Sequence, residues 1–168
     1  MTTLTIDIRP AEPDDAVDVA ETHRASWHHA YTGILPHKTL RAMIERRNAR
    51  WWQRAIRGST SILVLDVGGT IAGYATLGLN RARSLPQEGE IYELYLLPEY
   101  QGIGLGKRLF NETRKLLASL GCKGTVVWCL EDNLPAVDFY RGRGGRDIAE
   151  GTEVFDGQPV RKLAFVWK

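Results

Sequence analysis

A run of alternating glycines between a strand pattern and a helix pattern constrains this sequence most. Residues 96–110 read LLPEYQGIGLGKRLF, and three glycines alternate with apolar residues within 101–107. Pro98 stops the preceding strand pattern, and an amphipathic helix pattern follows at once. Glycines permit a close backbone approach, and the free N–H groups of a helix N-terminus attract anions. The segment therefore predicts a phosphate-binding loop, with a glycine-rich turn that holds no ligand as the alternative.

Two familiar nucleotide-binding fingerprints do not fit this loop. The dinucleotide pattern GxGxxG fails from either of the first two glycines, because a lysine or a leucine stands where its third glycine is required. A Walker A loop needs four residues between its glycines and then Lys-Ser/Thr. Here three residues separate Gly102 from Gly106, and Arg108 follows Lys107. Both NAD-type binding and ATP or GTP hydrolysis are therefore disfavoured.

The rest of the chain alternates between strand and helix periodicity. Strand patterns occupy 4–9, 61–67, 70–79, 90–97, 125–130, 147–155 and 160–167, and helix patterns occupy 11–31, 38–57, 103–120 and 133–140. The dipeptides Gly68-Gly69 and Asp156-Gly157 predict two hairpin turns. The order β-α-α-β-β-β-α-β-α-β-β predicts an α/β (α+β) fold. Its sheet is mixed and mostly antiparallel, with about seven strands and with helices on both faces.

Composition excludes several classes of protein. The 22 Lys and Arg residues nearly balance the 20 Asp and Glu residues, and they are scattered, which disfavours a nucleic-acid binder. No apolar run reaches the roughly 18 residues that span a bilayer, and no signal peptide is evident, so we expect a cytoplasmic protein without membrane contact. Cys122 and Cys129 are expected to be reduced thiols. The four histidines lack metal-ligand spacing and are expected on helix faces or loops, without a metal.

Two separate motifs resemble the GCN5-related N-acetyltransferase (GNAT) superfamily. The first is Gln101-Gly102-Ile103-Gly104-Leu105-Gly106, which matches the pattern Q/R-x-x-G-x-G/A and follows an approach made by Leu94, Leu96, Pro98 and Tyr100. The second is a downstream segment in which Asn133, Ala136, Phe139, Tyr140 and Gly144 match the family pattern. Gly145 departs from that pattern because Phe is usual there. The segment 26–36 also resembles many bacterial members, so the resemblance covers nearly the whole chain and implies a single N-acetyltransferase domain over 1–168.

The resemblance implies acetyl transfer from acetyl-CoA to a primary amine of a small molecule or peptide, by direct attack in a ternary complex. It implies that the pyrophosphate lies on backbone N–H groups from Gln101 to Lys107. The pantetheine arm would follow the 90–97 strand where it splays from the 125–130 strand, and a backbone N–H near Leu97 would stabilise the oxyanion. The implied cofactor-binding residues are Leu96, Leu97, Gln101, Gly102, Ile103, Gly104, Leu105, Gly106, Lys107, Asn133 and Tyr140.

The reaction requires an acid and a base. An alkyl amine has a pKa of about 10, so it must lose a proton before it attacks, and the departing thiolate gains from protonation. Tyr140 matches the family tyrosine that commonly donates this proton. Glu90 and Glu93 are candidate bases, although strand alternation places them on opposite faces unless a bulge intervenes. We favour Glu93, because Leu94 and Leu96 are expected to share the core face; either glutamate could instead be a solvated edge residue.

The acceptor pocket is expected between the first two helices and their connecting loop, with Trp27 and Tyr31 as candidate contacts. An aromatic, mildly acidic pocket would suit a small amine or a peptide N-terminus better than a polyamine. A non-catalytic acyl-CoA-binding module is the alternative function, and the presence of Tyr140 argues against it. The C-terminal hairpin could pair between subunits, which would give a homodimer.

Overall fold

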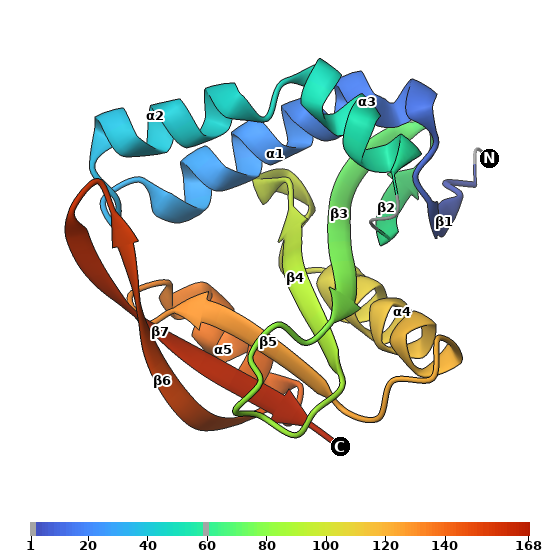
Figure 1. Ribbon diagram of the computed structural model, residues 1–168. Helices are drawn as coiled ribbons and strands as arrows, with labels where there is room; N and C mark the ends of the chain where they lie inside the picture. Colours follow the sequence, from blue (N-terminus) through green and yellow to red (C-terminus); the bar gives the residue numbers. More distant parts are fainter. Residues whose placement is uncertain (1–2, 59–60) are drawn as a thin grey trace.

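A seven-stranded sheet organises the chain, and the computed structural model describes residues 3–58 and 61–168 (Figure 1). The strands are β1 (Ile6–Pro10), β2 (Ser61–Val67), β3 (Thr70–Leu79), β4 (Gly89–Leu96), β5 (Thr125–Leu130), β6 (Arg146–Phe155) and β7 (Gln158–Trp167). The helices are α1 (Ala16–Tyr31), α2 (His37–Arg46), α3 (Ala49–Arg57), α4 (Leu105–Ser119) and α5 (Leu134–Gly142), with short 3-10 helices η1 (Pro13–Asp15) and η2 (Pro98–Tyr100).

The strand order is β1-β2-β3-β4-β5-β7-β6, and only β4 and β5 are parallel. The two hairpin turns lie where the sequence predicts them: Gly68 and Gly69 have φ values of 60° and 93°, and Asp156 and Gly157 have 47° and 79°. These positive φ values suit the tight turns of hairpins. The predicted mixed, mostly antiparallel sheet is therefore confirmed.

Pairing between β4 and β5 is short. It joins Gly89–Ile91 of β4 to Thr125–Val127 of β5, and Figure 1 shows the two strands diverging beyond that point. The sheet thus divides into a half made by β1–β4 and a half made by β5, β7 and β6. The backbone of β4 beyond Ile91 consequently has no paired strand on the β5 side.

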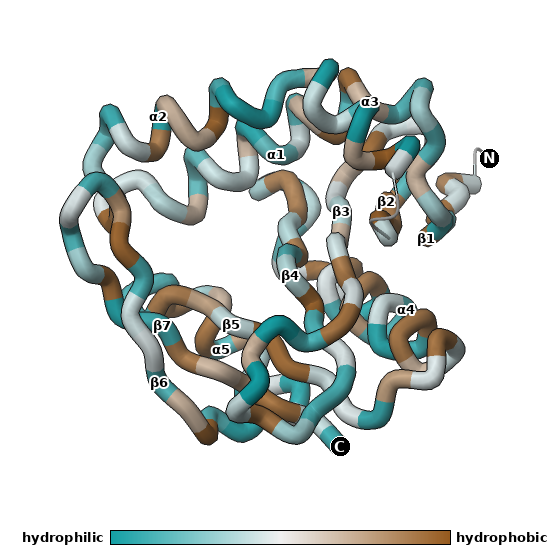
Figure 2. The backbone as a smooth tube through the Cα atoms, viewed as in Figure 1, coloured by the Kyte–Doolittle hydropathy of each residue, from teal (hydrophilic) through white to brown (hydrophobic). Residues whose placement is uncertain are grey.

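Helices cover both faces of the sheet, as predicted. Helices α1 and α3 pack on β2 and β3, where Val19 and Trp52 contact Tyr74 and its neighbours. Helices α4 and α5 contribute Phe110 and Val137 to the larger core on the other face. Figure 2 shows hydrophobic segments along β4 and α4, whereas the connection between β3 and β4 is mostly hydrophilic. The core under α4 and α5 joins the two halves of the sheet, because it includes residues of β2, β3 and β4 and of β5 and β7.

The single helix predicted over 38–57 is wrong, because the chain forms two helices with a break between them. Arg47 and Asn48 lie in the break, and the Asn48 side chain accepts a hydrogen bond from the Trp51 N–H at 3.0 Å. An asparagine in this position satisfies one of the unpaired donors of a new helix N-terminus. The break turns Arg47 out of helical register and into the protein.

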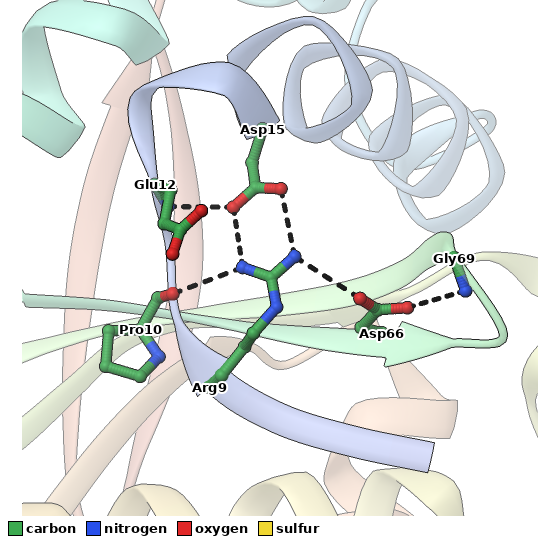
Figure 3. A network of polar contacts seen from close by, with 6 residues as sticks. All are labelled: Arg9, Pro10, Glu12, Asp15, Asp66 and Gly69. Carbon is green, nitrogen blue, oxygen red and sulfur yellow. Dashed lines mark hydrogen bonds and ion pairs between the residues drawn. The ribbon is translucent and has the colours of Figure 1, made fainter. Parts of the chain in front are cut away.

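A charged cluster fixes the entry to α1 (Figure 3). The Arg9 guanidinium on β1 contacts the Asp15 carboxylate at 2.8 and 3.0 Å and the Asp66 carboxylate at 3.3 Å. Asp15 also accepts the Glu12 N–H at 2.7 Å, and Asp66 accepts the Gly69 N–H at 2.8 Å. Its hydrogen bond with Arg9 lowers the pKa of Asp15. The cluster ties β1, the start of α1 and the β2–β3 turn together.

His23 lies on the buried face of α1, where aromatic side chains surround it. Its ring contacts the rings of Trp27, Trp52 and Tyr74, with centroids 4.5, 5.6 and 6.3 Å away. Neither ring nitrogen has a hydrogen-bond partner among the described residues. Burial, with a smaller effect from Arg47, lowers the pKa of His23 to about 3. The histidine is therefore neutral in the folded protein at physiological pH.

We predict that His23 makes the protein sensitive to mild acid. Its pKa is about 3 when folded and 6.5 when unfolded, so only the unfolded state binds the extra proton between these values. The free energy of unfolding should then fall as pH decreases through this window, by up to about 1.4 kcal/mol per pH unit. His23→Phe should remove this dependence, measured by urea unfolding between pH 4.5 and 7.5. His28→Phe, on the exposed side of α1, is the control, and an unchanged slope in His23→Phe would contradict the account.

Candidate active site

Two cavities lie on either side of the divergence between β4 and β5, and Tyr95 lines both. The first, of about 460 Å³, is bordered by the glycine loop, α5 and part of α1, and we call it the glycine-loop cavity. The second, of about 430 Å³, lies among α1, α2, α3, β4, β5 and the β6–β7 hairpin, and we call it the aromatic cavity. Molecules bound in the two cavities would therefore both lie next to Tyr95.

The glycine loop folds so that the α4 N-terminus faces the first cavity. Gly102 and Gly104 have φ values of 78° and 87°, a region that favours glycine. Gly104 is the N-cap of α4, and no side chain caps the helix. The N–H groups of the first turn, through Lys107, are therefore free to bind an anion. A side chain at Gly106 would contact the Phe139 ring at 3.3 Å, so this glycine lets α4 and α5 approach closely.

Most of the predicted cofactor-binding residues border this cavity. Those that do are Leu96, Gln101, Gly102, Gly104, Gly106, Lys107, Asn133 and Tyr140. The side chain of Ile103 is exposed, and that of Leu105 packs in the main core. The loop motif therefore contributes its glycines and backbone to the cavity rather than its apolar side chains.

For the oxyanion donor expected near Leu97, the backbone geometry favours the N–H of the preceding residue over that of Leu97 itself. The Leu97 N–H already donates to the Ala72 carbonyl of β3 at 2.8 Å. Backbone groups alternate along a strand, so the Leu96 N–H points away from β3 and into the gap beside β5. The Leu96 carbonyl lies on the same side and accepts a hydrogen bond from Gln101 Nε2 at 3.1 Å. Leu96 is therefore the residue of this strand end whose N–H faces the cavity.

Asn133 and Tyr140 come from α5. Asn133 caps this helix by accepting the Ala136 N–H at 3.4 Å. Tyr140 is 5% exposed, and its hydroxyl has no hydrogen-bond partner within residues 3–58 and 61–168. Burial raises the pKa of Tyr140, with smaller contributions from Cys129 and Tyr31. The phenol therefore keeps its proton at neutral pH, as a proton donor must.

The departure at Gly145 has a packing explanation. A Cβ there would lie 2.5 Å from the Trp167 ring and 2.9 Å from the Tyr140 carbonyl oxygen. The Trp167 indole N–H donates to the Arg143 carbonyl at 3.0 Å, and its ring packs against Phe110 and Tyr140. Trp167, at the end of β7, therefore occupies the space in which a side chain at position 145 would lie.

Aromatic side chains from distant parts of the chain line the second cavity. They include both candidates named from the sequence, Trp27 and Tyr31, together with Trp51, Trp52, Tyr92, Tyr95, Trp128 and Phe155. The Tyr31 and Tyr95 hydroxyls hydrogen-bond to each other, and burial raises the pKa of Tyr31 to about 12. Cys129 also lines the cavity as a neutral thiol, because burial raises its pKa to about 12.

A bulge intervenes between Glu90 and Glu93 on β4, which is the exception to strand alternation that the sequence left open. Thr76 of β3 pairs with Glu93 and Leu77 pairs with Ile91, so one extra residue, Tyr92, lies between them on β4. A bulge of this kind reverses the alternation of side chains beyond it. Both glutamates therefore line the aromatic cavity.

The two glutamates differ in their partners. The Glu90 carboxylate is saturated: Oε1 accepts the Arg81 backbone N–H at 3.0 Å, and Oε2 accepts the Arg81 guanidinium at 2.8 Å. Glu93 Oε1 accepts from Arg47, whereas Glu93 Oε2 is buried without a partner among the described residues. Of these two glutamates, only Glu93 therefore keeps a carboxylate oxygen without a hydrogen-bond partner among the described residues.

Such a two-sided site suits the transfer of a group between two bound molecules.

The family model described as Acetyltransferase (GNAT) family matches residues 20–144, more than half of the chain. A relative, the uncharacterized N-acetyltransferase YuaI of Bacillus subtilis, is 28% identical over 96% of this chain and 92% of its own length. The mycothiol acetyltransferase of Pseudarthrobacter chlorophenolicus is 33% identical over 83% of this chain, which spans only 42% of that relative.

Solved structures share the fold. The PaiA N-acetyltransferase of Thermoplasma acidophilum, solved in complex with coenzyme A, aligns with a TM-score of 0.76 and 22% identity over 94% of this chain and 98% of that one. The chain belongs to the GNAT family and is an acetyl-CoA-dependent N-acetyltransferase. Within the described residues, no helix is long and apolar enough to cross a membrane, and no three His, Cys, Asp or Glu residues gather as a metal site.

We predict that Gly104→Ala weakens acetyl-CoA binding about tenfold. An alanine at φ 87° costs roughly 1–2 kcal/mol of strain, and its relief would move the N-terminus of α4. Gly142→Ala is the control, because its Cβ would meet no atom within 4 Å and its φ is not positive. Isothermal titration with acetyl-CoA measures both variants. Equal affinity of Gly104→Ala and the unmodified protein would contradict a role for this turn.

Proposed function

We propose that the protein acetylates a primary amine of a small molecule or peptide by direct attack within a ternary complex. The observation that carries the proposal is that two cavities lie beside the gap between β4 and β5 and share Tyr95 as a lining residue. Acetyl-CoA binds in the glycine-loop cavity and the amine binds in the aromatic cavity. The amine nitrogen and the thioester then come together without a covalent acyl-enzyme.

Backbone groups hold the donor. The free N–H groups at the start of α4 bind the pyrophosphate, and the Lys107 side chain at the cavity edge adds positive charge. The pantetheine arm follows β4 into the gap, where this strand lacks a partner. The Leu96 N–H then stabilises the negative charge that develops on the thioester oxygen.

Tyr140 protonates the departing sulfur. It lines the glycine-loop cavity, its hydroxyl has no competing partner among the described residues, and burial raises its pKa. The free hydroxyl and its retained proton suit a general acid, whose removal typically costs two to four orders of magnitude in rate. They also separate this proposal from a non-catalytic acyl-CoA-binding module, which would not need the hydroxyl.

We predict that Tyr140→Phe lowers kcat about 10²-fold or more and leaves acetyl-CoA affinity unchanged. The measurements are steady-state release of CoA, followed with a thiol reagent, and titration calorimetry for binding. Tyr100→Phe is the matched control, because Tyr100 lines neither cavity. Full turnover by Tyr140→Phe would exclude the tyrosine as the acid.

Glu93 removes the proton from the amine. Glu93 lines the aromatic cavity, and its Oε2 has no hydrogen-bond partner among the described residues, so this carboxylate keeps an oxygen that can accept a proton. Glu90 is less suited, because Arg81 engages both of its oxygens. We assign Glu90 to holding the β3–β4 connection in place.

We predict that Glu93→Gln makes the reaction depend on free amine from solution. The amine has a pKa of about 10, so kcat/KM of the variant should rise about tenfold per pH unit between pH 7 and 9. It should also lie well below that of the unmodified protein at pH 7. A profile measured in parallel on both proteins tests this. Parallel profiles of similar height would show that Glu93 is not the base.

The charges of the aromatic cavity favour an acceptor with one amine. Its lining includes the carboxylates Glu90, Glu93 and Glu153 and the cations Arg47, Arg81 and Lys162. This balance offers no net attraction for a polycation. It distinguishes the proposal from the activity named for a relative, the spermidine N(1)-acetyltransferase of Thermoplasma acidophilum, which is 24% identical over 84% of this chain. Release of CoA across a panel of aliphatic, aromatic and peptide amines tests the acceptor class.

A further inference from the structure

Arg47 occupies an unusual position for a positive charge. It is the first residue after α2, and its guanidinium forms an ion pair with Glu93 inside the aromatic cavity. The same guanidinium lies over the rings of Trp27, Trp51 and Trp52, with distances of 5.4, 4.6 and 5.8 Å to the ring centroids. A carboxylate surrounded by aromatic faces is a general binding site for an organic cation. Here the protein supplies that cation itself.

We propose that Arg47 determines acceptor specificity. As the built-in counterion of Glu93, it keeps the aromatic cavity electrically balanced and excludes amines that carry a second positive charge. The inference rests on the proposed function, since it concerns the acceptor side of the same site.

Among the described residues, no other cation in the lining of the aromatic cavity is placed to neutralise Glu93 in the absence of Arg47. The Arg81 guanidinium is committed to Glu90, and it lies over the Tyr92 ring at 4.1 Å. Lys162 lies over the Trp128 ring at 4.7 Å, on the β7 side. Glu153 is exposed on β6. Neutralising Arg47 would therefore leave an excess of one negative charge beside three tryptophan rings.

A second ammonium group would then find the position that the guanidinium holds now. It would gain the Glu93 carboxylate and the tryptophan faces, and Glu93 is only 10% exposed, so water screens this interaction weakly. In the unmodified protein the same ammonium would meet a like charge. The ratio of activity on a diamine to activity on a monoamine therefore depends on the charge at position 47. If Arg47 had only a structural role, its substitution would change both activities by the same factor and leave the ratio constant.

The test compares kcat/KM for 1,4-diaminobutane and for butylamine, with acetyl-CoA saturating. In Arg47→Met the ratio of diamine to monoamine should rise at least tenfold over that of the unmodified protein. Arg47→Lys keeps the charge and should leave the ratio within about twofold. Arg46→Met, on the preceding exposed residue, removes the same charge outside the cavity and should also leave the ratio unchanged. Arg47→Gln, neutral but able to hydrogen-bond to Glu93, gives a second comparison if Arg47→Met does not fold.

The outcomes separate this inference from the proposed function. A ratio that stays constant in both neutral variants, whether or not total activity falls, would overturn the specificity role. A rise of the same size in Arg46→Met would assign the effect to overall charge and would overturn it as well. If the unmodified protein acetylates no member of the amine panel, the proposed function itself fails.

Discussion

The early end of pairing between β4 and β5 is the constraint on which the site depends. These parallel strands share three residue pairs, from Gly89–Thr125 to Ile91–Val127, and then separate. In a continuous sheet, the N–H and C=O groups of β4 beyond Ile91 would be hydrogen-bonded to β5. Here they face a gap instead, and buried backbone groups of this kind need hydrogen-bond partners. A substrate with amide and carbonyl groups provides them. The two cavities lie beside this separation and share Tyr95 as a lining residue.

Local features of β4 and of the loop after it place different functional groups on the two sides of the gap. The bulge at Tyr92 brings both Glu90 and Glu93 to the aromatic cavity, while η2 and the glycine loop turn the N-terminus of α4 toward the glycine-loop cavity. On the other half of the sheet, α5 carries Tyr140 to the gap, and Trp167 packs against it. The half made by β1–β4 thus contributes the two glutamates and the N-terminus of α4, and the other half contributes Tyr140.

Local sequence signals predicted the strands, the hairpins, the strand–loop–helix unit and the Asn133 cap. Asn48 is a favoured N-cap residue and could have indicated the break, but the continuous apolar periodicity of 38–57 predicted one helix. The β4 bulge had no local signal, because it arises from the pairing of β4 with β3. The sequence predicted Trp27 and Tyr31 as acceptor contacts, and both line the aromatic cavity. The positions of Trp128 and Phe155 in that cavity, and the contact of Arg47 with Glu93, depend on tertiary packing.

A crystal structure of the protein with acetyl-CoA tests the central claim most directly, because that claim concerns where the donor lies. The account predicts the pyrophosphate on the N–H groups at the start of α4. It also predicts the thioester oxygen within hydrogen-bonding distance of the Leu96 N–H, and the sulfur within reach of the Tyr140 hydroxyl. A pantetheine arm that lies outside the gap between β4 and β5, or a thioester remote from both Leu96 and Tyr140, would contradict it.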